Sequence, residues 1–227
     1  MHVPAFGRGL KLPLTLEDLD RSGFATATLP ASGPGAERQV ALTFDDGPHP
    51  EGTPKMLEVL AEFDARATFF LVGEQVVKRP ALARQIVTMG HTIGLHGYVH
   101  RPHPTRTSRA MREDFERGLA AIADATGVEP RLHRPPYGIY SPASLRIARE
   151  RGLQPLLWSK WGKDWRTVAT PEQITHRVVD GVQAGDVILL HDADYYSAKR
   201  SHRRTAAALP RIMRKLQSEE LGTVAFS

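Results

Sequence analysis

An alternation of short β-rich runs with longer segments of helical period constrains this chain more than any other feature of its sequence. Runs rich in branched and aromatic residues predict strands, and apolar residues spaced three and four apart predict amphipathic helices. The predicted strands cover residues 40–44, 68–72, 92–95, a short run around Leu132, 153–158, 187–190 and 223–226. The predicted helices cover residues 53–63, 80–89, 108–125, 141–151, 171–182 and 205–217. This order predicts an α/β fold with about seven parallel strands, which a chain of 227 residues can close into a barrel.

Several helix ends carry local signals. Ser141 and Thr170 can each accept a hydrogen bond from an exposed backbone amide, and a proline follows each of them, at a helical position that needs no donor. Glycines stand where three predicted helices stop, at positions 90, 127 and 152.

Residues 1–38 differ from the rest of the chain because prolines and glycines interrupt them repeatedly. We expect an irregular N-terminal leader segment over 1–38 and one folded catalytic domain over 39–227, since the length fits a single large domain better than two small ones. The chain has no cysteine, so no disulfide framework holds it together.

Neither a membrane span nor a nucleic-acid partner is expected. No run of 18 apolar residues occurs. The formal net charge is +5, but the dense basic cluster at 199–204 lacks the interleaved aromatic residues of an RNA-binding motif. We expect the longer polar segment from Asp192 to Arg204 to form a loop bordering the substrate cleft, with Asp194 or the tyrosines contacting sugar hydroxyls or an anionic group; a solvated surface loop is the alternative. The sequence defines no oligomeric state.

Acidic residues at positions 17, 18 and 20 interrupt the apolar region that a signal peptide requires. The chain as given is therefore expected in the cytoplasm, or outside the cell if a leader peptide was removed.

Polar and titratable side chains collect at the predicted carboxyl ends of five strands, where ligands bind in barrels and in doubly wound sheets. They are Asp45 and Asp46 after the first strand, His96 and His100 after the third, Arg134 after the fourth, Asp164 after the fifth and His191 at the end of the sixth.

Asp45 and Asp46 are adjacent on an extended chain, so their side chains point to opposite sides and can serve different roles, although an Asp-rich turn is the simpler alternative. His96 and His100 are four residues apart, which directs both at one point on a helical turn or in a tight loop; a hydrogen-bonded surface pair is the alternative. Two histidines and one aspartate suit Zn²⁺ or a similar ion and leave positions open for water and substrate. Three other histidines, at 49, 91 and 103, lie at less convergent places in the strand order.

Two further segments follow the predicted strands. Two prolines after Arg134 hold this residue and the Tyr137 backbone rigidly, although a solvated arginine on a stiff loop would have the same pattern. Trp158, Trp161 and Trp165 lie within eight residues and offer indole faces that pack well against sugar rings, with core packing as the alternative.

Taken in order, these segments resemble those of the NodB-homology polysaccharide deacetylases, carbohydrate esterase family 4. TFDDGP at 43–48, RPPYG at 134–138 and ILLHD at 188–192 match motifs of that family, and the likeness spans about residues 40–226. The resemblance implies a distorted (β/α) barrel.

Two departures from the family pattern fall beside the predicted site. The family carries Ser or Thr at the positions of Gly97 and Val99, so the hydroxyls that would support the loop between the two histidines are missing. The family also carries an aspartate where this chain has Trp161. These departures bear on how the site is supported and on which substrate it prefers.

The resemblance implies a role for each site residue. Asp46, His96 and His100 would hold a divalent metal, Zn²⁺ before Co²⁺ or Ni²⁺. Asp45 would be the general base, oriented by Arg134, and His191 the general acid, tuned by Asp164. The Tyr137 backbone amide would stabilise the oxyanion, Leu189 would line the pocket for the acetyl methyl group, and Trp165 would contact the substrate.

The implied function is that of a metal-dependent hydrolase that removes acetyl groups from an N-acetylated sugar, whether a polysaccharide, a cell-wall fragment or a small glycoside. An O-acetyl esterase acting on xylan-like chains would use the same metal site. A non-catalytic carbohydrate-binding relative is a further alternative, which Asp45 and His191 disfavour because binding alone needs neither a base nor an acid.

Overall fold

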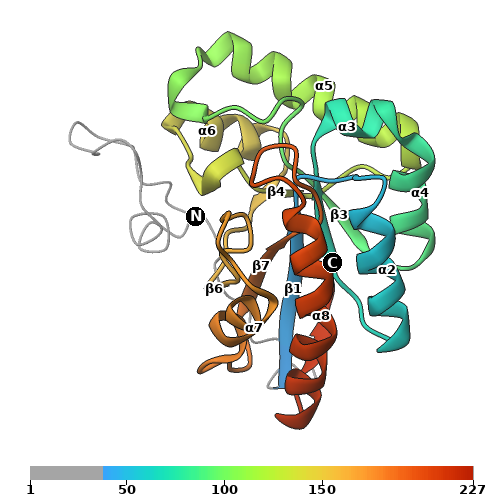
Figure 1. Ribbon diagram of the computed structural model, residues 1–227. Coiled ribbons are helices and arrows are strands. Elements are labelled where there is room, and N and C mark those ends of the chain that lie inside the picture. Colours follow the sequence, from blue (N-terminus) through green and yellow to red (C-terminus); the bar gives the residue numbers. More distant parts are fainter. Residues whose placement is uncertain (1–37, 227) are drawn as a thin grey trace.

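A curled parallel sheet surrounded by helices makes up residues 38–226, the part of the chain that the computed structural model describes (Figure 1). The strands are β1 (Gln39–Asp45), β2 (Thr68–Leu71), β3 (Thr92–Leu95), β4 (Leu132–His133), β5 (Gln154–Pro155), β6 (Lys160–Trp161), β7 (Val187–His191) and β8 (Gly222–Val224). The helices are α2 (Gly52–Glu62), α3 (Gly73–Lys78), α4 (Pro80–Thr88), α5 (Ser108–Thr126), α6 (Pro142–Glu150), α7 (Pro171–Val179) and α8 (Ser201–Ser218), with 3₁₀ turns η2 (His103–Thr105) and η3 (Pro136–Gly138). The leader predicted over 1–38 lies outside the described residues except for Arg38, so it stays a prediction.

The strands are parallel and follow the order β5-β4-β3-β2-β1-β7-β6. Asp45, the last residue of β1, lies opposite Phe70 of β2 and His191 of β7, so an acidic and a basic side chain meet at the same edge. β8 pairs with the first half of β1. The predicted α/β fold with a distorted barrel of about seven parallel strands is confirmed.

The two edge strands of this sheet are close in sequence. β5 pairs with β4 and β6 pairs with β7, and only residues 156–159 connect the two edges, so the sheet curls until its edges approach. The single strand predicted over 153–158 is therefore wrong. Only Gln154–Pro155 of the predicted range forms a strand, β5, because the chain leaves the sheet edge beside β4 directly after Pro155 and joins the edge beside β7 at β6.

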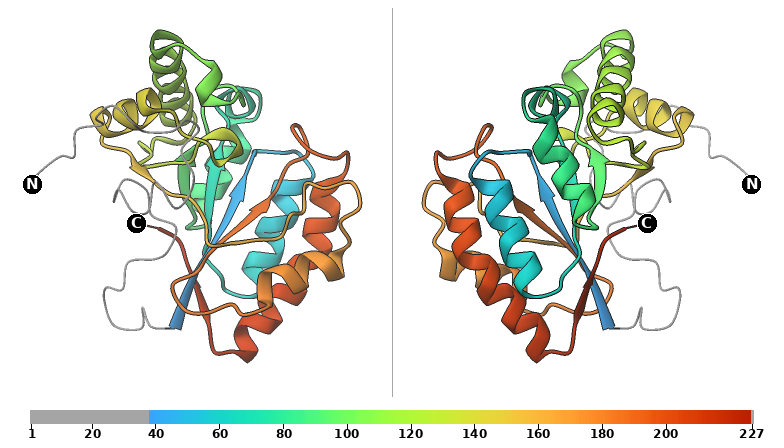
Figure 2. Two further views of the ribbon diagram at one scale, coloured as in Figure 1. Left: turned by 90° about the vertical axis from the view of Figure 1, so that its left-hand side faces the viewer. Right: turned by 90° about the vertical axis from the view of Figure 1, so that its right-hand side faces the viewer.

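Apolar residues of β1 face two separate cores, because side chains alternate along a strand. Val40, Leu42 and Phe44 are fully buried among residues of the surrounding helices. Ala41 belongs to a smaller core inside the barrel. The helices form a continuous outer layer, in which α7 contacts α8, α8 contacts α2, α2 contacts α4, and α5 lies between α4 and α6 (Figure 2).

Most helix signals in the sequence are confirmed. Ser141 and Thr170 each cap their helix in a capping box, with a proline in its first turn. Gly90, Gly127 and Gly152 all have positive φ at helix ends. The short helix α3 was not predicted.

Helix α8 begins at Ser201, four residues before the predicted start, so the prediction of a loop over residues 199–204 is wrong for most of it. The residues that its first turns bury are polar, Ser201, His202 and Thr205, and a search for apolar periodicity does not detect them.

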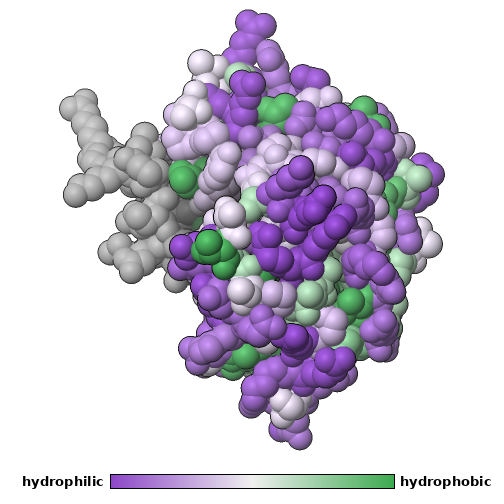
Figure 3. Space-filling view, viewed as in Figure 1, coloured by the Kyte–Doolittle hydropathy of each residue, from purple (hydrophilic) through white to green (hydrophobic). Residues whose placement is uncertain are grey.

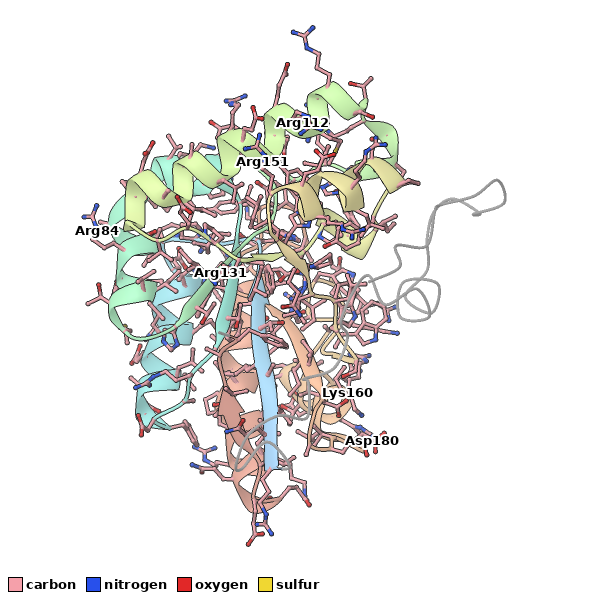
Figure 4. The ribbon with its side chains drawn as sticks, turned by 180° about the vertical axis from the view of Figure 1, so that it is seen from behind. Arg84, Arg112, Arg131, Arg151, Lys160 and Asp180 are labelled. Atoms are coloured by element: carbon pink, nitrogen blue, oxygen red, sulfur yellow. The ribbon has the colours of Figure 1, made fainter. Side chains whose placement is uncertain are left out.

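One face of the molecule is largely polar. Figure 3 shows this face as mostly hydrophilic, with small separate apolar patches. On the far side, Arg112 of α5 pairs with Glu150 of α6 at 2.7 Å, and Arg151 pairs with Glu116 (Figure 4). No helix within residues 38–226 is long and apolar enough to cross a membrane.

Candidate active site

A pocket of about 230 Å³ opens at the carboxyl ends of β1, β3 and β7. Ligand sites of parallel α/β folds lie at this edge. Its walls are Asp45, Asp46, His96, His100, Tyr137, Gly138, Trp158, Trp161, Trp165, Leu189, His191, Tyr196 and Ser197.

One wall of the pocket brings together Asp46, His96 and His100. The Oδ1 atom of Asp46 lies 3.4 Å from Nε2 of His96 and 3.2 Å from Nε2 of His100. This oxygen is buried and has no hydrogen-bond partner among the residues that the structure describes. Burial alone would raise the pKa of Asp46, but the imidazoles of His100 and His96 hold it well below its usual range. A buried carboxylate facing two imidazole nitrogens fits a divalent metal.

The tautomer of His96 also suits metal binding. Its Nδ1 lies 2.8 Å from the carbonyl oxygen of Arg134. A carbonyl oxygen can only accept, so Nδ1 carries the hydrogen and Nε2 keeps its lone pair toward Asp46. The histidine ring is thereby oriented by the backbone directly after β4.

The loop between the histidines is supported by a carboxylate instead of by hydroxyl groups. Asp114 of α5 is buried and accepts hydrogen bonds from the backbone amides of Tyr98 (2.8 Å) and Val99 (3.2 Å) and from Arg106 (2.6 Å). Gly97 has φ +82°, and a Cβ at this position would lie 3.1 Å from Oδ2 of Asp114. The departures at Gly97 and Val99 are thus accompanied by a different support for the loop.

Asp45 is held from the inside of the barrel. The Nη1 atom of Arg134 donates to Oδ1 of Asp45 and to Oγ1 of Thr43, both at 2.8 Å. The same guanidinium donates to the carbonyls of Leu156 (3.0 Å) and Leu157 (2.8 Å), in the segment that joins the two sheet edges. Arg134 is fully buried, so this one side chain both closes the barrel and fixes Asp45.

His191 stands on the opposite side of the pocket with a fully buried partner. Nδ1 of His191 lies 2.9 Å from Oδ1 of Asp164, and Oδ2 of Asp164 accepts from the His191 amide and from Oγ1 of Thr205, both at 2.7 Å. Burial would lower the pKa of His191, but Asp164, with Asp46 and Asp45 further away, raises it to about 10. His191 is therefore an imidazolium at neutral pH and directs Nε2 away from Asp164.

The remaining predicted residues also line the pocket. Tyr137 has φ +63° and is 54% exposed, whereas Leu189 is buried. Trp165 packs edge-on against His191, with ring centroids 5.5 Å apart, and Trp161 lies between Trp158 and Trp165. The aromatic side chains form one wall of the pocket.

The histidines at less convergent positions in the strand order, and Asp194, lie outside the pocket lining. His91 and His103 are buried, and burial lowers the pKa of His91 to about 4 and that of His103 to about 3. Asp194 interacts with His49 and His202, outside the pocket lining. Of the polar segment predicted to border the cleft, Tyr196 and Ser197 line the pocket, whereas the basic residues 199–204 do not.

Sequence reasoning missed Asp114, which acts from another helix. One signal was available, because Asp114 falls on the buried face of α5 together with Met111, Phe115 and Gly118. A carboxylate in such a stripe requires donors, since an unpaired buried charge is costly.

The fold and the site together define a class. A metal-capable Asp-His-His group, a fixed carboxylate and a protonated histidine around one pocket of an α/β barrel are typical of metal-dependent hydrolases.

Comparison with known proteins identifies the family. The polysaccharide deacetylase family matches residues 32–156. The chain is 35% identical to a peptidoglycan-N-acetylglucosamine deacetylase of Bacillus cereus over 208 residues, 91% of this chain and 92% of the relative. It is 37% identical to a chitooligosaccharide deacetylase of Sinorhizobium fredii over 193 residues, 82% of this chain and 88% of the relative.

The structure agrees with the sequence comparison. A crystal structure of a peptidoglycan N-acetylglucosamine deacetylase matches with a TM-score of 0.83 and 30% identity, covering 93% of this chain and 95% of that one. The chain belongs to the polysaccharide deacetylase family, carbohydrate esterase family 4, and is a carbohydrate deacetylase that removes acetyl groups from N-acetylated sugars.

Proposed function

We propose that this deacetylase acts on N-acetylglucosamine units of a cell-wall or chitin-type oligosaccharide, with Zn²⁺ held by Asp46, His96 and His100. The observation that carries this assignment is the buried Oδ1 of Asp46, which faces two imidazole nitrogens and has no hydrogen-bond partner within residues 38–226. The names of the relatives support N-acetylglucosamine as the sugar, and a ligand set of nitrogen and oxygen atoms supports zinc as the metal. When bound, the ion supplies a Lewis acid for the acetyl carbonyl and acidifies water.

Asp45 is the general base in this proposal. Arg134 occupies its Oδ1, so Oδ2, which lies 3.8 Å from Nε2 of His96, remains to accept the proton of the attacking water. Because Arg134 is bonded to four acceptors, the position of Asp45 is fixed before substrate binds.

His191 is the general acid. Asp164 holds Nδ1 and keeps the imidazolium charged, so Nε2 carries the proton that the sugar nitrogen needs before it can leave as an amine. The Tyr137 backbone amide stabilises the oxyanion, a contribution of about 3 kcal/mol to the barrier for donors of this kind. Leu189 accommodates the acetyl methyl group and Trp165 contacts the sugar, as its place beside His191 allows.

Acetate release tests the proposal. The substrates are N-acetylglucosamine oligomers and acetylxylan, with chelator-treated enzyme before and after Zn²⁺ is restored. We expect zinc-restored release from the N-acetylated oligomers. Release from acetylxylan alone would instead establish an O-acetyl esterase, and no release from either by enzyme with confirmed bound zinc would favour a binding protein.

A further inference from the structure

His100 is held differently from the other two histidines of the pocket. His96 bonds through Nδ1 to a backbone carbonyl, and His191 bonds through Nδ1 to Asp164. Nδ1 of His100 is buried and has no hydrogen-bond partner within residues 38–226. Metal-ligating histidines usually donate from their second nitrogen to a fixed acceptor, which orients the ring. Some other contact must therefore orient His100.

Two aromatic rings provide that contact. Tyr196 stacks on His100 with ring centroids 4.1 Å apart and an interplanar angle of only 5°. Tyr137 meets the same imidazole edge-on at 4.6 Å and 63°. Turning the imidazole out of this plane about its Cβ–Cγ bond would break the parallel stack, so Tyr196 holds the ring in the plane in which Nε2 faces Asp46.

Tyr196 is itself fixed at its other end. Its hydroxyl donates to Oε1 of Glu74 at 2.7 Å and accepts from Nε2 of Gln75 at 3.1 Å, so both of its hydrogen-bonding roles are used. Glu74 and Gln75 belong to α3, which packs against α5, the helix that carries Asp114. The Tyr196 ring and the loop between the histidines are thus attached to adjoining helices.

The backbone that carries Tyr196 is also restrained. Asp194 accepts hydrogen bonds from the Arg200 amide at 2.5 Å and, through its backbone carbonyl, from the Ser197 amide at 3.4 Å. Nε2 of His49 lies 3.2 Å from the Asp194 carboxylate. The loop after β7 is therefore tied to the start of α2 on one side of Tyr196 and to α3 through its hydroxyl.

We propose that Tyr196 is a positioning residue for the metal ligand His100, and that ring stacking here replaces the hydrogen bond that normally orients a ligating histidine. The inference rests on the proposed assignment of His100 as a ligand. It assigns a role to the loop after β7 in holding the metal, in addition to lining the pocket.

The test measures zinc affinity without substrate, by competition between chelator-treated protein and a chromogenic chelator. Tyr196→Leu removes the stacked ring, and we expect it to weaken zinc binding about 10-fold or more, the usual effect of losing a group that orients a ligand. Tyr196→Phe keeps the ring and should bind zinc within about threefold of wild type, since stacking does not need the hydroxyl.

Tyr195→Leu is the matched control, because it removes an equally large ring from the adjacent position, where the ring packs on His49 instead of His100. Thermal unfolding of the metal-free variants shows whether each one folds. The Co²⁺ absorption spectrum, which reports ligand geometry, should change in Tyr196→Leu and remain unchanged in Tyr195→Leu.

Zinc affinity of Tyr196→Leu equal to that of wild type would overturn the inference, as would an equal loss of affinity in Tyr195→Leu. Failure of the ligand assignment gives a different result: wild type would then bind no zinc, or His100→Ala would bind it as tightly as wild type does.

Discussion

Two clusters of two histidines and one aspartate lie within residues 38–226, and they invite comparison. One consists of Asp46, His96 and His100, and the other of His49, Asp194 and His202. In each cluster the nitrogen and oxygen atoms that could bind a metal lie within 4.8 Å of one another. By distance alone, both could hold an ion.

The positions of the imidazole ring protons distinguish the two clusters. Nδ1 of His96 donates to a carbonyl, so Nε2 offers its lone pair to the cluster. Nδ1 of His49 accepts from the amides of Glu51 (3.1 Å) and Gly52 (3.0 Å), at the start of α2, so Nε2 carries the hydrogen and faces the Asp194 carboxylate at 3.2 Å. Burial, together with the nearby His202 and Arg79, lowers the pKa of His49 and disfavours a second proton. His49 serves as a helix cap and loop anchor, and the comparison teaches that a histidine whose Nδ1 accepts hydrogen bonds from backbone amides has no lone pair left on Nε2 for a metal.

The largest effect is expected when a ligand of the first cluster is removed. His96→Ala should weaken zinc binding by more than about 100-fold, beyond the usual cost of losing an orienting partner, and abolish acetate release. His49→Ala is the control and should still bind one zinc per chain, while losing about 1 kcal/mol of unfolding free energy through the lost cap. Metal analysis after dialysis measures both variants; full zinc occupancy in His96→Ala would refute the assignment.

Removal of the general acid His191 should impair catalysis and leave metal binding intact. His191→Ala should keep its zinc and lose about 10²–10⁴-fold in kcat, because an unprotonated amide nitrogen leaves poorly. Zinc content and steady-state kinetics on the same preparation check this. A variant that lost zinc along with turnover would show that His191 supports the metal as well.

A smaller effect on zinc affinity is expected when Asp114, which supports the loop between the histidines, is changed. Asp114→Asn puts an amide where a carboxylate accepts from two backbone amides and from Arg106, so zinc affinity should fall about 10-fold. Glu113→Gln changes the adjacent exposed acid and should leave the affinity unchanged. Zinc competition measures both, and equal affinities would show that the loop holds its shape without this charge.

The smallest expected effect is on how the free energy of unfolding of the metal-free protein depends on pH. The pKa of His191 is raised from 6.5 to about 10, so the imidazolium stabilises the folded state fully below pH 6.5, and this contribution is lost as the pH rises toward 10. Urea unfolding of metal-free wild type should show this loss between pH 6.5 and 10. His191→Gln should not show it, and an equal pH dependence in that variant would place the effect elsewhere.

Local signals in the sequence predicted those parts of the molecule that depend on local physics. Ser141 caps α6 through residues next to it in the chain. The apolar run of β1 is likewise visible within seven consecutive residues. The site was predictable in outline because strand ends bring Asp46, His96 and His191 to one edge.

What could not be predicted depends on partners distant in sequence. Two-residue strands such as β6 have too short a pattern to detect, and their pairing is set by closure of the barrel. The support of Asp114 for the loop and the stacking of Tyr196 on His100 join residues that only the fold brings together. The positions of the ring protons of His96 and His49 likewise follow from backbone groups that no motif specifies.

The most direct test of the central assignment is the position of bound zinc in a crystal of the zinc-loaded protein, located by anomalous diffraction at the zinc edge. The account predicts a single peak about 2.0–2.2 Å from Oδ1 of Asp46 and from Nε2 of His96 and His100. No peak there, or a peak among His49, Asp194 and His202 instead, would contradict it.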